Sequence, residues 1–342
     1  MELVQTLPAS WYRDAAYFER ERAPIFASSW MHVAYDFELP GPGSYITENL
    51  AGWPIFIRRD DSGALRAFYN LCPHRAGPIV WEGQGHAANM VCRYHGWAFG
   101  TDGALLSARD FGCPAPADMD LTPIQVESWR GLIFVCLRQD MPSLAESLGE
   151  IPQQLAELPF EGYTFHSRSV RHLACNWKTY ADNFLEGYHV PTVHPAMSRD
   201  ADSSNYEVII GRDPRWNTHV MPQRNSSTFG VFGWFWPTFA YDILPGGFAV
   251  ERWLPRGQTH TDLIFEYFFA DDAPEVEHTV RFSEEVADED AKVCEHVQRN
   301  LDAGNYVTGV LSPKWEYPLE SFHRMVREAI GEPAPAAAPR RG

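Results

Sequence analysis

The sequence has few basic side chains, no long apolar run and no internal repeat, and these shortages exclude several classes of protein. Its 28 Lys and Arg residues are outnumbered by 45 Asp and Glu residues, which gives a formal net charge of −17 at pH 7. This acidic balance argues against nucleic acid as a partner and is compatible with cationic ligands or redox partners. The most apolar stretch, residues 229–241, is about half the roughly 20 residues that a membrane span needs, and it contains Pro237. We therefore expect no membrane partner.

Cysteine is also scarce, and its distribution does not suggest disulfide bonds. The six cysteines lie at irregular intervals, and residues 1–14 lack the basic and apolar regions of a signal peptide. We expect a cytoplasmic location, where thiols stay reduced, and we therefore consider metal ligands before disulfides. A G-x-G-x-x-G segment between a strand and a helix is missing, so we expect no nucleotide or flavin site in this chain.

Turn signals and hydrophobic periodicity divide the chain into two folded parts. Residues 32–140 contain short β-like runs separated by turns such as Asp60-Asp61-Ser62-Gly63, which predicts a small antiparallel β domain. Beyond a connection near 141–152, the patterns of helices and strands mix. Helices are expected near 174–190 and 275–303, and strands near 206–210, 229–241, 246–254 and 262–270.

The predicted fold class is α+β, with a central antiparallel sheet flanked by helices in the second part. We expect four segments along the chain. They are an amphipathic lead-in over 1–31, the β domain over 32–140, the α+β domain over 141–331, and a disordered Ala/Pro-rich tail over 332–342.

Two Cys/His pairs stand out in the β domain, Cys72-Pro73-His74 and Cys92-Arg93-Tyr94-His95. Each pair is close to Pro or Gly, which suits two loops that project from strands and approach each other closely. Two thiolates on one iron and two imidazoles on the other are the ligand set of a Rieske cluster. The sequence therefore predicts a one-electron [2Fe–2S] centre on Cys72, His74, Cys92 and His95.

Two other interpretations of these four residues remain open. A structural Cys2His2 zinc site would use the same ligands, although a β domain of this size can fold without a metal and the spacing is not that of a zinc finger. Four unrelated core residues would be a coincidence of type and spacing. The remaining cysteines have no comparable partners, and we expect them to be small buried apolar residues. They are Cys113, Cys136, Cys175 and Cys294.

With these two loops, followed by the block from Asn176 to His194, the chain resembles the α subunit of Rieske non-haem iron oxygenases, also called ring-hydroxylating oxygenases. The resemblance covers nearly the whole chain. It implies a Rieske domain, a catalytic domain with mononuclear Fe(II), and O2 as co-substrate. It also implies electrons from NAD(P)H through a separate reductase, with or without a ferredoxin. A ring, commonly a homotrimer, is implied as well, because the two centres of one chain are too far apart for fast electron transfer.

A second possible metal site lies in the segment from Glu186 to His194. Glu186 and His189 are three residues apart, so a helix would place them on one face. Pro191 should end or kink that helix, and His194 would return from the next segment. Two imidazoles and one carboxylate form the facial triad of non-haem iron enzymes. A structural role for the two histidines is the alternative.

The long helix expected at 275–303 offers the carboxylate, and we choose Asp290. An apolar stripe of Phe282, Val286, Val293, Val297 and Leu301 includes Asp290 at helical spacing, whereas the neighbouring acidic residues should face solvent. A buried carboxylate is costly unless it is paired or bound to a metal. The family resemblance also implies an Asp in a helix of this kind. An inward carboxylate that pairs with an internal Arg remains the alternative.

The resemblance assigns a different role to Glu186, which would link the iron site of one subunit to a Rieske histidine of its neighbour. Most aromatic-dihydroxylating members have Asp at this position, and Glu resembles the choline, carnitine, betaine and stachydrine oxygenases. A simple ion pair is the alternative role.

Aromatic residues between 229 and 241 could enclose a quaternary ammonium by cation–π attraction or could pack a sheet. They are Phe229, Phe232, Trp234, Phe235, Trp236, Phe239 and Tyr241.

The function we expect is O2-dependent hydroxylation of a small organic molecule, by monooxygenation or oxidative N-demethylation of a quaternary or tertiary amine. Cis-dihydroxylation of an aromatic ring is the alternative within the same family. A non-catalytic Rieske electron carrier is an alternative of another class, but such carriers have about 100 residues and need no second domain. A zinc-stabilised binding module is the last alternative, and it would be colourless.

Overall fold

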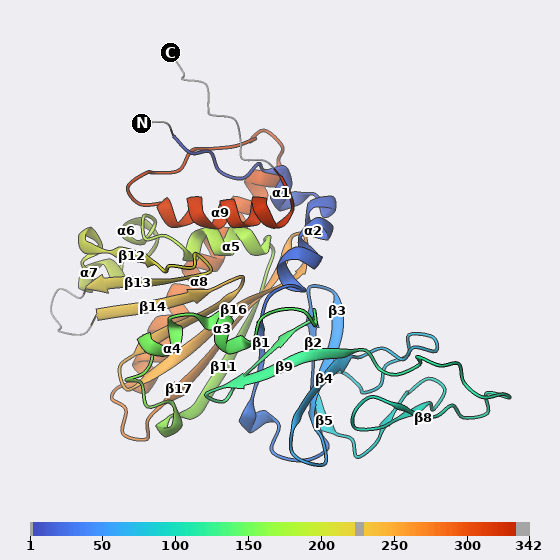
Figure 1. Ribbon diagram of the computed structural model, residues 1–342. Helices are drawn as coiled ribbons and strands as arrows, with labels where there is room; N and C mark the ends of the chain where they lie inside the picture. Colours follow the sequence, from blue (N-terminus) through green and yellow to red (C-terminus); the bar gives the residue numbers. More distant parts are fainter. Residues whose placement is uncertain (1–2, 223–228, 333–342) are drawn as a thin grey trace. The chain divides into compact units, whose positions relative to one another are not determined.

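The computed structural model describes residues 3–222 and 229–332 of the chain, so most of the tail that we expect to be disordered lies outside the described residues. The chain forms two compact units (Figure 1). One unit is Phe26–Ser147, and the other combines the described residues up to Ile25 with those from Leu148 onward. None of the helices in the described part is both long and apolar enough to cross a membrane.

The unit Phe26–Ser147 is built on two antiparallel sheets, as the β-like runs predict. The larger sheet has seven strands in the order β1-β10-β9-β4-β3-β2-β5, and the smaller has the order β6-β7-β8. The larger sheet comprises β1 (Met31–Tyr35), β2 (Ser44–Leu50), β3 (Trp53–Arg59), β4 (Leu65–Tyr69), β5 (Gln84–His86), β9 (Pro123–Trp129) and β10 (Leu132–Cys136). The smaller comprises β6 (Met90–Val91), β7 (Ala98–Phe99) and β8 (Leu105–Ser107). Phe56, Phe68 and Trp97 pack in the core that connects them.

The other unit contains a seven-stranded antiparallel sheet in the order β11-β17-β16-β15-β14-β13-β12. Its strands are β11 (Thr164–Leu173), β12 (Glu207–Ile210), β13 (Trp216–Pro222), β14 (Phe229–Phe235), β15 (Phe239–Leu244), β16 (Gly247–Gly257) and β17 (His260–Phe269). The first nine residues of β16 are all buried, as expected for a central strand that is covered on both faces. The two units together confirm the predicted α+β class.

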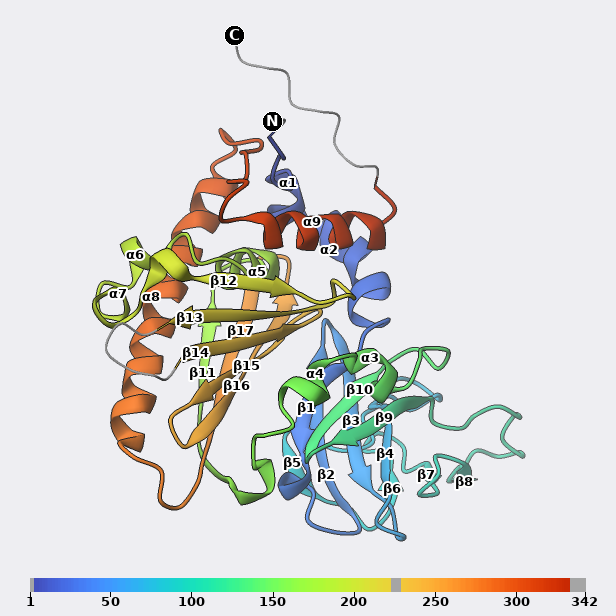
Figure 2. The ribbon, with the colours of Figure 1, turned by 60° about the vertical axis from the view of Figure 1, so that its left-hand side comes forward.

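Helices cover this sheet, and Figure 2 shows the longest of them, α8 (Val276–Asp302), beside it. Ser169 of β11 and Tyr267 of β17 both donate hydrogen bonds to Glu284, at 2.7 and 2.8 Å, which fixes α8 against the strands. The other helices of this unit are α1 (Ser10–Arg13), α2 (Ala15–Glu21), α4 (Ile151–Gln154), α5 (Trp177–Phe184), α6 (Val190–Val193), α7 (Met197–Asp200) and α9 (Tyr317–Ala329). In the smaller unit, α3 spans Leu144–Leu148 at its boundary.

Two details of the predicted helices are wrong. The helix expected at 174–190 is α5, which ends at Phe184, so Glu186 and His189 do not share a helical face. In α8, Val293 is only half-buried and Val297 is exposed, because the buried stripe lies one residue further along the helix. That stripe is Ala287, Asp290, Cys294, Gln298 and Leu301. Asp290 is nevertheless buried, and Glu285 and Asp288 are exposed as expected.

Candidate metal centres and the adjoining cavity

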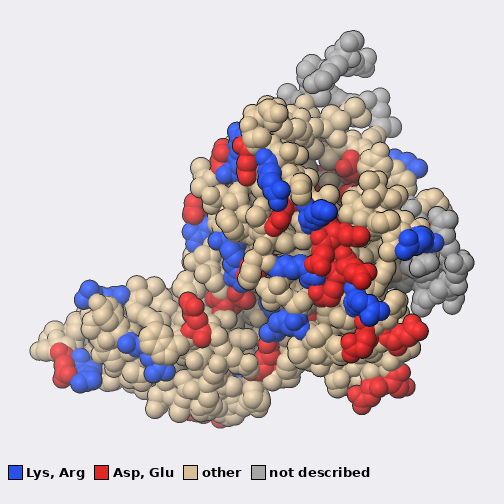
Figure 3. Space-filling model, turned by 180° about the vertical axis from the view of Figure 1, so that it is seen from behind, with Lys and Arg blue, Asp and Glu red and all other residues tan. Residues whose placement is uncertain are grey.

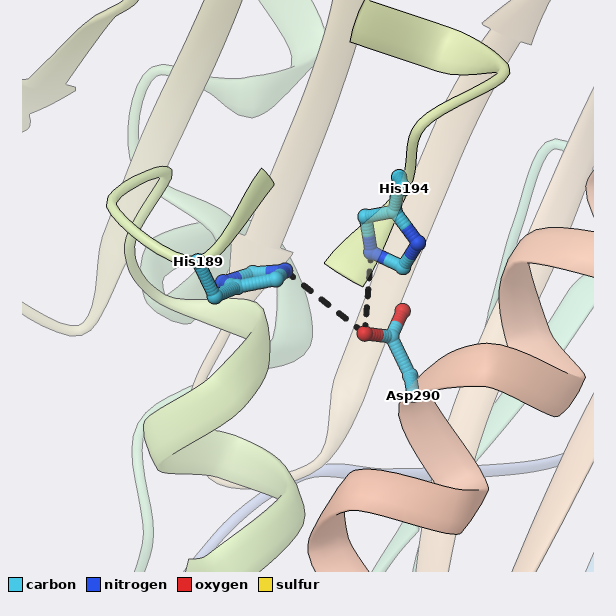
Figure 4. A group of neighbouring side chains, drawn as sticks. All are labelled: His189, His194 and Asp290. Atoms are coloured by element: carbon cyan, nitrogen blue, oxygen red, sulfur yellow. Dashed lines mark ion pairs between the residues drawn. The ribbon is translucent and has the colours of Figure 1, made fainter. Parts of the chain in front are cut away.

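His189, His194 and Asp290 meet at one point of the catalytic unit (Figure 4). His189 directly precedes α6, which carries Pro191 in its first turn, and His194 directly follows it, so this short helix turns both imidazoles towards the middle of α8. Asp290 Oδ1 lies 3.0 Å from His194 Nε2 and 3.6 Å from His189 Nε2. The three ligand atoms all lie within 4.8 Å of one another, so they could hold one metal ion.

The bonding state of Asp290 supports this interpretation. Its Oδ1 atom is buried and receives no well-formed hydrogen bond from the described residues. A buried carboxylate oxygen without a donor is costly, and a cation would satisfy it. Two imidazoles and one carboxylate are also the donor set that suits non-haem iron. The residues therefore fit a mononuclear iron ion.

Carboxylates orient both imidazoles from the opposite side. His189 Nδ1 lies 2.7 Å from Glu186 Oε1, and His194 Nδ1 lies 2.8 Å from Glu289 Oε2. Burial alone would lower the pKa of His194, but Asp290 and Glu289 outweigh burial and raise it. Carboxylates of this kind fix the ring orientation and tautomer of a metal-bound histidine. With the proton on Nδ1, the lone pair of Nε2 on each ring is available to bind a metal.

Glu186 is itself firmly held in the turn between α5 and α6. Besides the contact with His189 Nδ1, its Oε2 atom accepts backbone N–H groups of Tyr188 and His189. The side chain is buried. Glu186 therefore lies beside the metal site, in contact with one of the two histidines.

The four predicted cluster ligands come together in two loops of the smaller unit. Backbone hydrogen bonds close each loop, from Cys72 N–H to Gly77 C=O and from Cys92 N–H to Trp97 C=O, both at 2.8 Å. The Cys72 and Cys92 side chains are buried, and the His74 and His95 rings lie 4.7 Å apart by their centroids.

Several observations indicate that these four residues fit an iron–sulfur cluster. His74 Nδ1 and His95 Nδ1 are buried, and no described residue bonds to them. Burial raises the pKa of the Cys72 thiol to about 11, so a cation is needed to stabilise a thiolate there. No three ligand atoms of Cys72, His74, Cys92 and His95 all lie within 4.8 Å of one another. The four side chains are therefore spread more widely than the ligands of a single zinc ion.

Gly77 explains how closely the two loops approach each other. A Cβ atom at this position would lie 2.9 Å from Cys92 Sγ and 2.7 Å from Tyr94 Cβ. These distances are too short for any other residue, so glycine is required here.

Of the remaining cysteines, Cys136, Cys175 and Cys294 are buried as expected, but Cys113 is exposed because it lies in an irregular loop. The expectation for Cys113 is wrong.

A cavity of about 580 Å³ adjoins His189, His194 and Asp290. Its aromatic lining includes Phe184, Tyr206, Phe232, Phe265 and Phe282. Of the aromatic residues predicted between 229 and 241, Phe232 contributes to this lining, whereas five others are buried in the core. Those five are Trp234, Phe235, Trp236, Phe239 and Tyr241, and the side chain of Phe229 lies outside the described residues.

Two acidic residues on the cavity wall escaped the sequence prediction. Asp242 and Glu251 line the cavity from β15 and β16. Each is a single carboxylate within an apolar strand sequence, Ala240-Tyr241-Asp242-Ile243-Leu244 and Phe248-Ala249-Val250-Glu251. A lone charge in an apolar strand could have identified Asp242, whereas Glu251 is followed directly by Arg252 and has no such pattern.

Comparisons with known proteins agree with this arrangement. Residues 160–332 match the family model described as "Ring hydroxylating alpha subunit (catalytic domain)", and residues 29–124 match the "Rieske [2Fe-2S] domain". Choline monooxygenase from Beta vulgaris is 28% identical over 95% of this chain and 77% of its own length. The carnitine monooxygenase oxygenase subunit from Acinetobacter pittii is 29% identical over 89% of this chain and 87% of its own.

Solved structures show the same fold. The quaternary ammonium Rieske monooxygenase CntA superimposes with a TM-score of 0.85 at 26% identity and covers 96% of both chains. Naphthalene 1,2-dioxygenase superimposes with a TM-score of 0.76 at 20% identity, over 96% of this chain and 94% of its own, which shows a shared fold.

Proposed function

Because the chain belongs to the ring-hydroxylating oxygenase α subunits and carries a Rieske [2Fe–2S] domain, we propose that it is the terminal oxygenase for a small quaternary or tertiary amine. It is a Rieske non-haem iron oxygenase, with a [2Fe–2S] cluster, a mononuclear iron and O2 as co-substrate. When bound, the iron activates O2 and the cluster supplies electrons one at a time. The proposed reaction inserts one oxygen atom into a C–H bond beside nitrogen, while two electrons and two protons reduce the other atom to water.

The residues of this chain take the following roles in the proposal. Cys72, His74, Cys92 and His95 hold the cluster, and His189, His194 and Asp290 hold the iron. Glu186 and Glu289 keep the Nδ1 proton on the two iron-binding imidazoles, so that both present Nε2 to the metal. These residues would supply three donor atoms to the iron, which would leave room for O2, and the adjoining cavity would hold the substrate.

The observation that carries this proposal is the convergence of His189, His194 and Asp290 at the wall of one cavity. An electron carrier would need no such site. The choice of an amine rests on the choline and carnitine monooxygenases among the relatives and on the aromatic lining of the cavity. Aromatic faces attract alkylammonium groups by cation–π interaction. The acidic balance of the chain also favours the approach of a cation.

Electrons are proposed to come from NAD(P)H through a separate reductase, with or without a ferredoxin, because one of the relatives is itself named as an oxygenase subunit. A homotrimeric ring is the proposed assembly. In it, Glu186 would connect His189 to a Rieske histidine of the neighbouring subunit, and the electron would cross the subunit interface at this contact. The 2.7 Å contact between Glu186 Oε1 and His189 Nδ1 supports the part of this role that lies within one subunit.

The test is an O2-consumption screen of the iron-loaded enzyme with NADH and a surrogate reductase. The panel pairs choline and carnitine with their tertiary amine analogues and includes aromatic acids and naphthalene. We expect amine-dependent O2 uptake with equimolar formaldehyde or hydroxylated amine, and no turnover by Asp290→Ala. Conversion of arenes to cis-diols with inert amines would contradict the proposed substrate class.

A further inference from the structure

Two carboxylates on the cavity wall are buried and form no ion pair with any Lys or Arg among the described residues. The Asp242 side chain of β15 and the Glu251 side chain of β16 are 7% and 3% exposed. Glu251 Oε1 receives no hydrogen bond from any described residue, although the Tyr180 hydroxyl lies close to this carboxylate. A buried charge without a partner is strongly unfavourable, so this pair is not explained by the stability of the fold.

Two other buried carboxylates of the same unit have Lys or Arg partners. Glu266 is fully buried on β17 and forms ion pairs with Arg252 at 3.1 Å and Arg168 at 2.5 Å. Glu21 is fully buried and forms an ion pair with Lys178 at 2.6 Å. The chain therefore supplies an internal cation to Glu21 and Glu266, whereas the buried carboxylates of Glu186 and Asp290 lie beside the histidines of the proposed iron site. Arg199 also lines the cavity, but it is exposed and forms no ion pair with Asp242 or Glu251, so a cation for this pair would have to be a ligand in the cavity.

The strand register directs both carboxylates to the same side of the sheet. Asp242 pairs with Ala249, and Glu251 pairs with Ala240, so the two acidic residues are diagonal neighbours on adjacent antiparallel strands. Directly paired residues share a face of the sheet. On the other neighbouring strand, Asp242 pairs with Phe232 of β14 and Glu251 pairs with Phe265 of β17, so an aromatic side chain of the cavity lining lies beside each carboxylate on the same face. The same cavity reaches His189, His194 and Asp290.

The electrostatics of the pair agree with a site for a cation. Burial raises the pKa of Asp242 to about 7, and burial together with the charge of Asp242 raises the pKa of Glu251 well above its ordinary value. The positive charge of Arg171 lowers the pKa of Glu251 in part, but the Arg171 guanidinium forms its ion pairs with Glu284 and Asp288, each at 2.7 Å. A positive group in the cavity would favour the ionised form of both carboxylates.

We propose that Asp242 and Glu251 bind the positively charged nitrogen group of the substrate and select cationic amines over neutral molecules of the same shape. This inference rests on the proposed function and adds the residues that recognise the charge. The aromatic side chains of the cavity then surround the alkyl groups. A tertiary ammonium can also donate its N–H to Glu251 Oε1, whereas a quaternary ammonium interacts with the pair through charge alone.

The experiment measures ligand binding rather than turnover. The oxidised enzyme with cluster and iron is titrated calorimetrically with choline, with its tertiary analogue 2-(dimethylamino)ethanol, and with the neutral carbon isostere 3,3-dimethylbutan-1-ol. Asp242→Asn and Glu251→Gln keep the size of each side chain and remove its charge. We expect each variant to weaken binding of both cations at least tenfold, with the larger loss for the tertiary amine in Glu251→Gln. Binding of the neutral isostere should be unchanged.

Asp271→Asn is the matched control, because it removes an exposed charge from the turn between β17 and α8, outside the cavity, and should leave all three affinities unchanged. Wild-type enzyme alone gives a second test that needs no variant, since it should bind choline at least tenfold more tightly than the neutral isostere. Equal affinities for choline and its isostere, or variants that bind the cations as the wild type does, would overturn the role of the pair. If amines are still turned over in those cases, the proposed function holds and only the role of Asp242 and Glu251 is wrong. Turnover of arenes but not of amines would instead contradict the proposed function.

Discussion

His194 Nε2 lies 3.0 Å from Asp290 Oδ1, although the two residues come from a short turn after α6 and from the middle of α8. The buried Oδ1 atom of Asp290 receives no well-formed hydrogen bond in the described structure, so a metal ion between the two side chains would supply the missing positive charge. This contact joins the two halves of the proposed iron site.

The first prediction concerns the iron ligands. His189→Ala, His194→Ala and Asp290→Ala should each remove the mononuclear iron and lower turnover at least 100-fold, because each removes one of three donors. Iron and acid-labile sulfide analysis, with the visible spectrum, checks this. Two irons and the red-brown colour should remain in every variant. Asp288→Ala is the control and should retain the third iron. Loss of iron in Asp288→Ala with retention in Asp290→Ala would contradict the assignment.

The second prediction concerns the cluster. Cys92→Ala should abolish the visible absorption of the Rieske centre, since a thiolate ligand is lost. His95→Cys should lower the reduction potential of any cluster that assembles, because a thiolate adds negative charge where the imidazole was neutral. Spectroelectrochemistry measures the potential, and Cys136→Ala is the control that removes a buried cysteine outside the two loops. An unchanged spectrum in Cys92→Ala would show that this ligand assignment is wrong.

The third prediction concerns electron transfer through Glu186. Glu186→Gln should leave both metal centres and the oligomer intact and slow re-oxidation of the reduced cluster by O2 and substrate at least tenfold, because in the proposed assembly the carboxylate connects His189 to a Rieske histidine of the neighbouring subunit. Glu186→Asp should have a milder effect. Stopped-flow absorption measures the rate, and analytical ultracentrifugation checks the assembly. Wild-type re-oxidation in Glu186→Gln, or an active monomer, would return Glu186 to a structural role.

The fourth prediction concerns pH. The pKa of Asp242 is raised to about 7 by burial, so its carboxyl is protonated below that pH and ionised above it. Affinity for choline should therefore rise between pH 6 and pH 8, by up to about tenfold per pH unit while one proton is released, and then level off. Asp242→Asn should weaken this dependence. Calorimetry at several pH values measures it, and a flat wild-type profile would contradict the coupling.

Other titratable groups near Asp242 define what else could contribute to this profile. The groups that line the cavity are Tyr180, Glu186, His189, His194, Arg199, Tyr206, His219, Glu251, His278, Glu285 and Asp290, and Tyr267 of β17 also interacts with the charge of Asp242. Burial lowers the pKa of His219 to about 3 and raises that of Tyr180 well above its ordinary value. Neither of these two groups therefore changes its charge between pH 6 and pH 8.

The raised pKa of Asp242 also makes the free energy of unfolding depend on pH, and this stability falls with rising pH whereas the affinity for choline rises. An Asp with the ordinary value of 3.8 in the unfolded chain loses its proton at lower pH than Asp242 does in the native protein. The native state therefore binds more protons between about pH 4 and pH 7, and this group makes the protein less stable as the pH rises through that window. A bound cation should offset the loss.

Local patterns in the sequence were sufficient for several parts of the structure. The two Cys/His loops were predictable because their ligands lie close together in the chain, and α8 was predictable because 27 residues give a long amphipathic pattern. Figure 3 shows carboxylates gathered on the face opposite to that seen in Figure 1, and the exposure of Glu285 and Asp288 agrees with their expected place in solvent.

Features that depend on tertiary contacts were not predictable in the same way. The end of α5 at Phe184 is followed by a turn in which Glu186 binds backbone N–H groups, and helical periodicity does not contain this information. β11, β13 and α9 were missed. β11 is mostly exposed or half-buried and has few apolar residues, whereas β13 and α9 have buried residues that the sequence prediction overlooked. The cavity wall combines residues from five strands and several helices, so only the three-dimensional fold brings Asp242 and Glu251 into the same space as the iron site.

The most direct test of the account is a single turnover of the iron-loaded enzyme. The cluster is reduced photochemically without O2, the free reductant is removed, and the enzyme is then mixed with choline or carnitine and O2. The account predicts that the cluster is re-oxidised and that demethylated or hydroxylated amine forms in proportion to the sites that hold both centres. Re-oxidation without any oxidised amine, together with cis-diol formation when naphthalene replaces the amine, would contradict it.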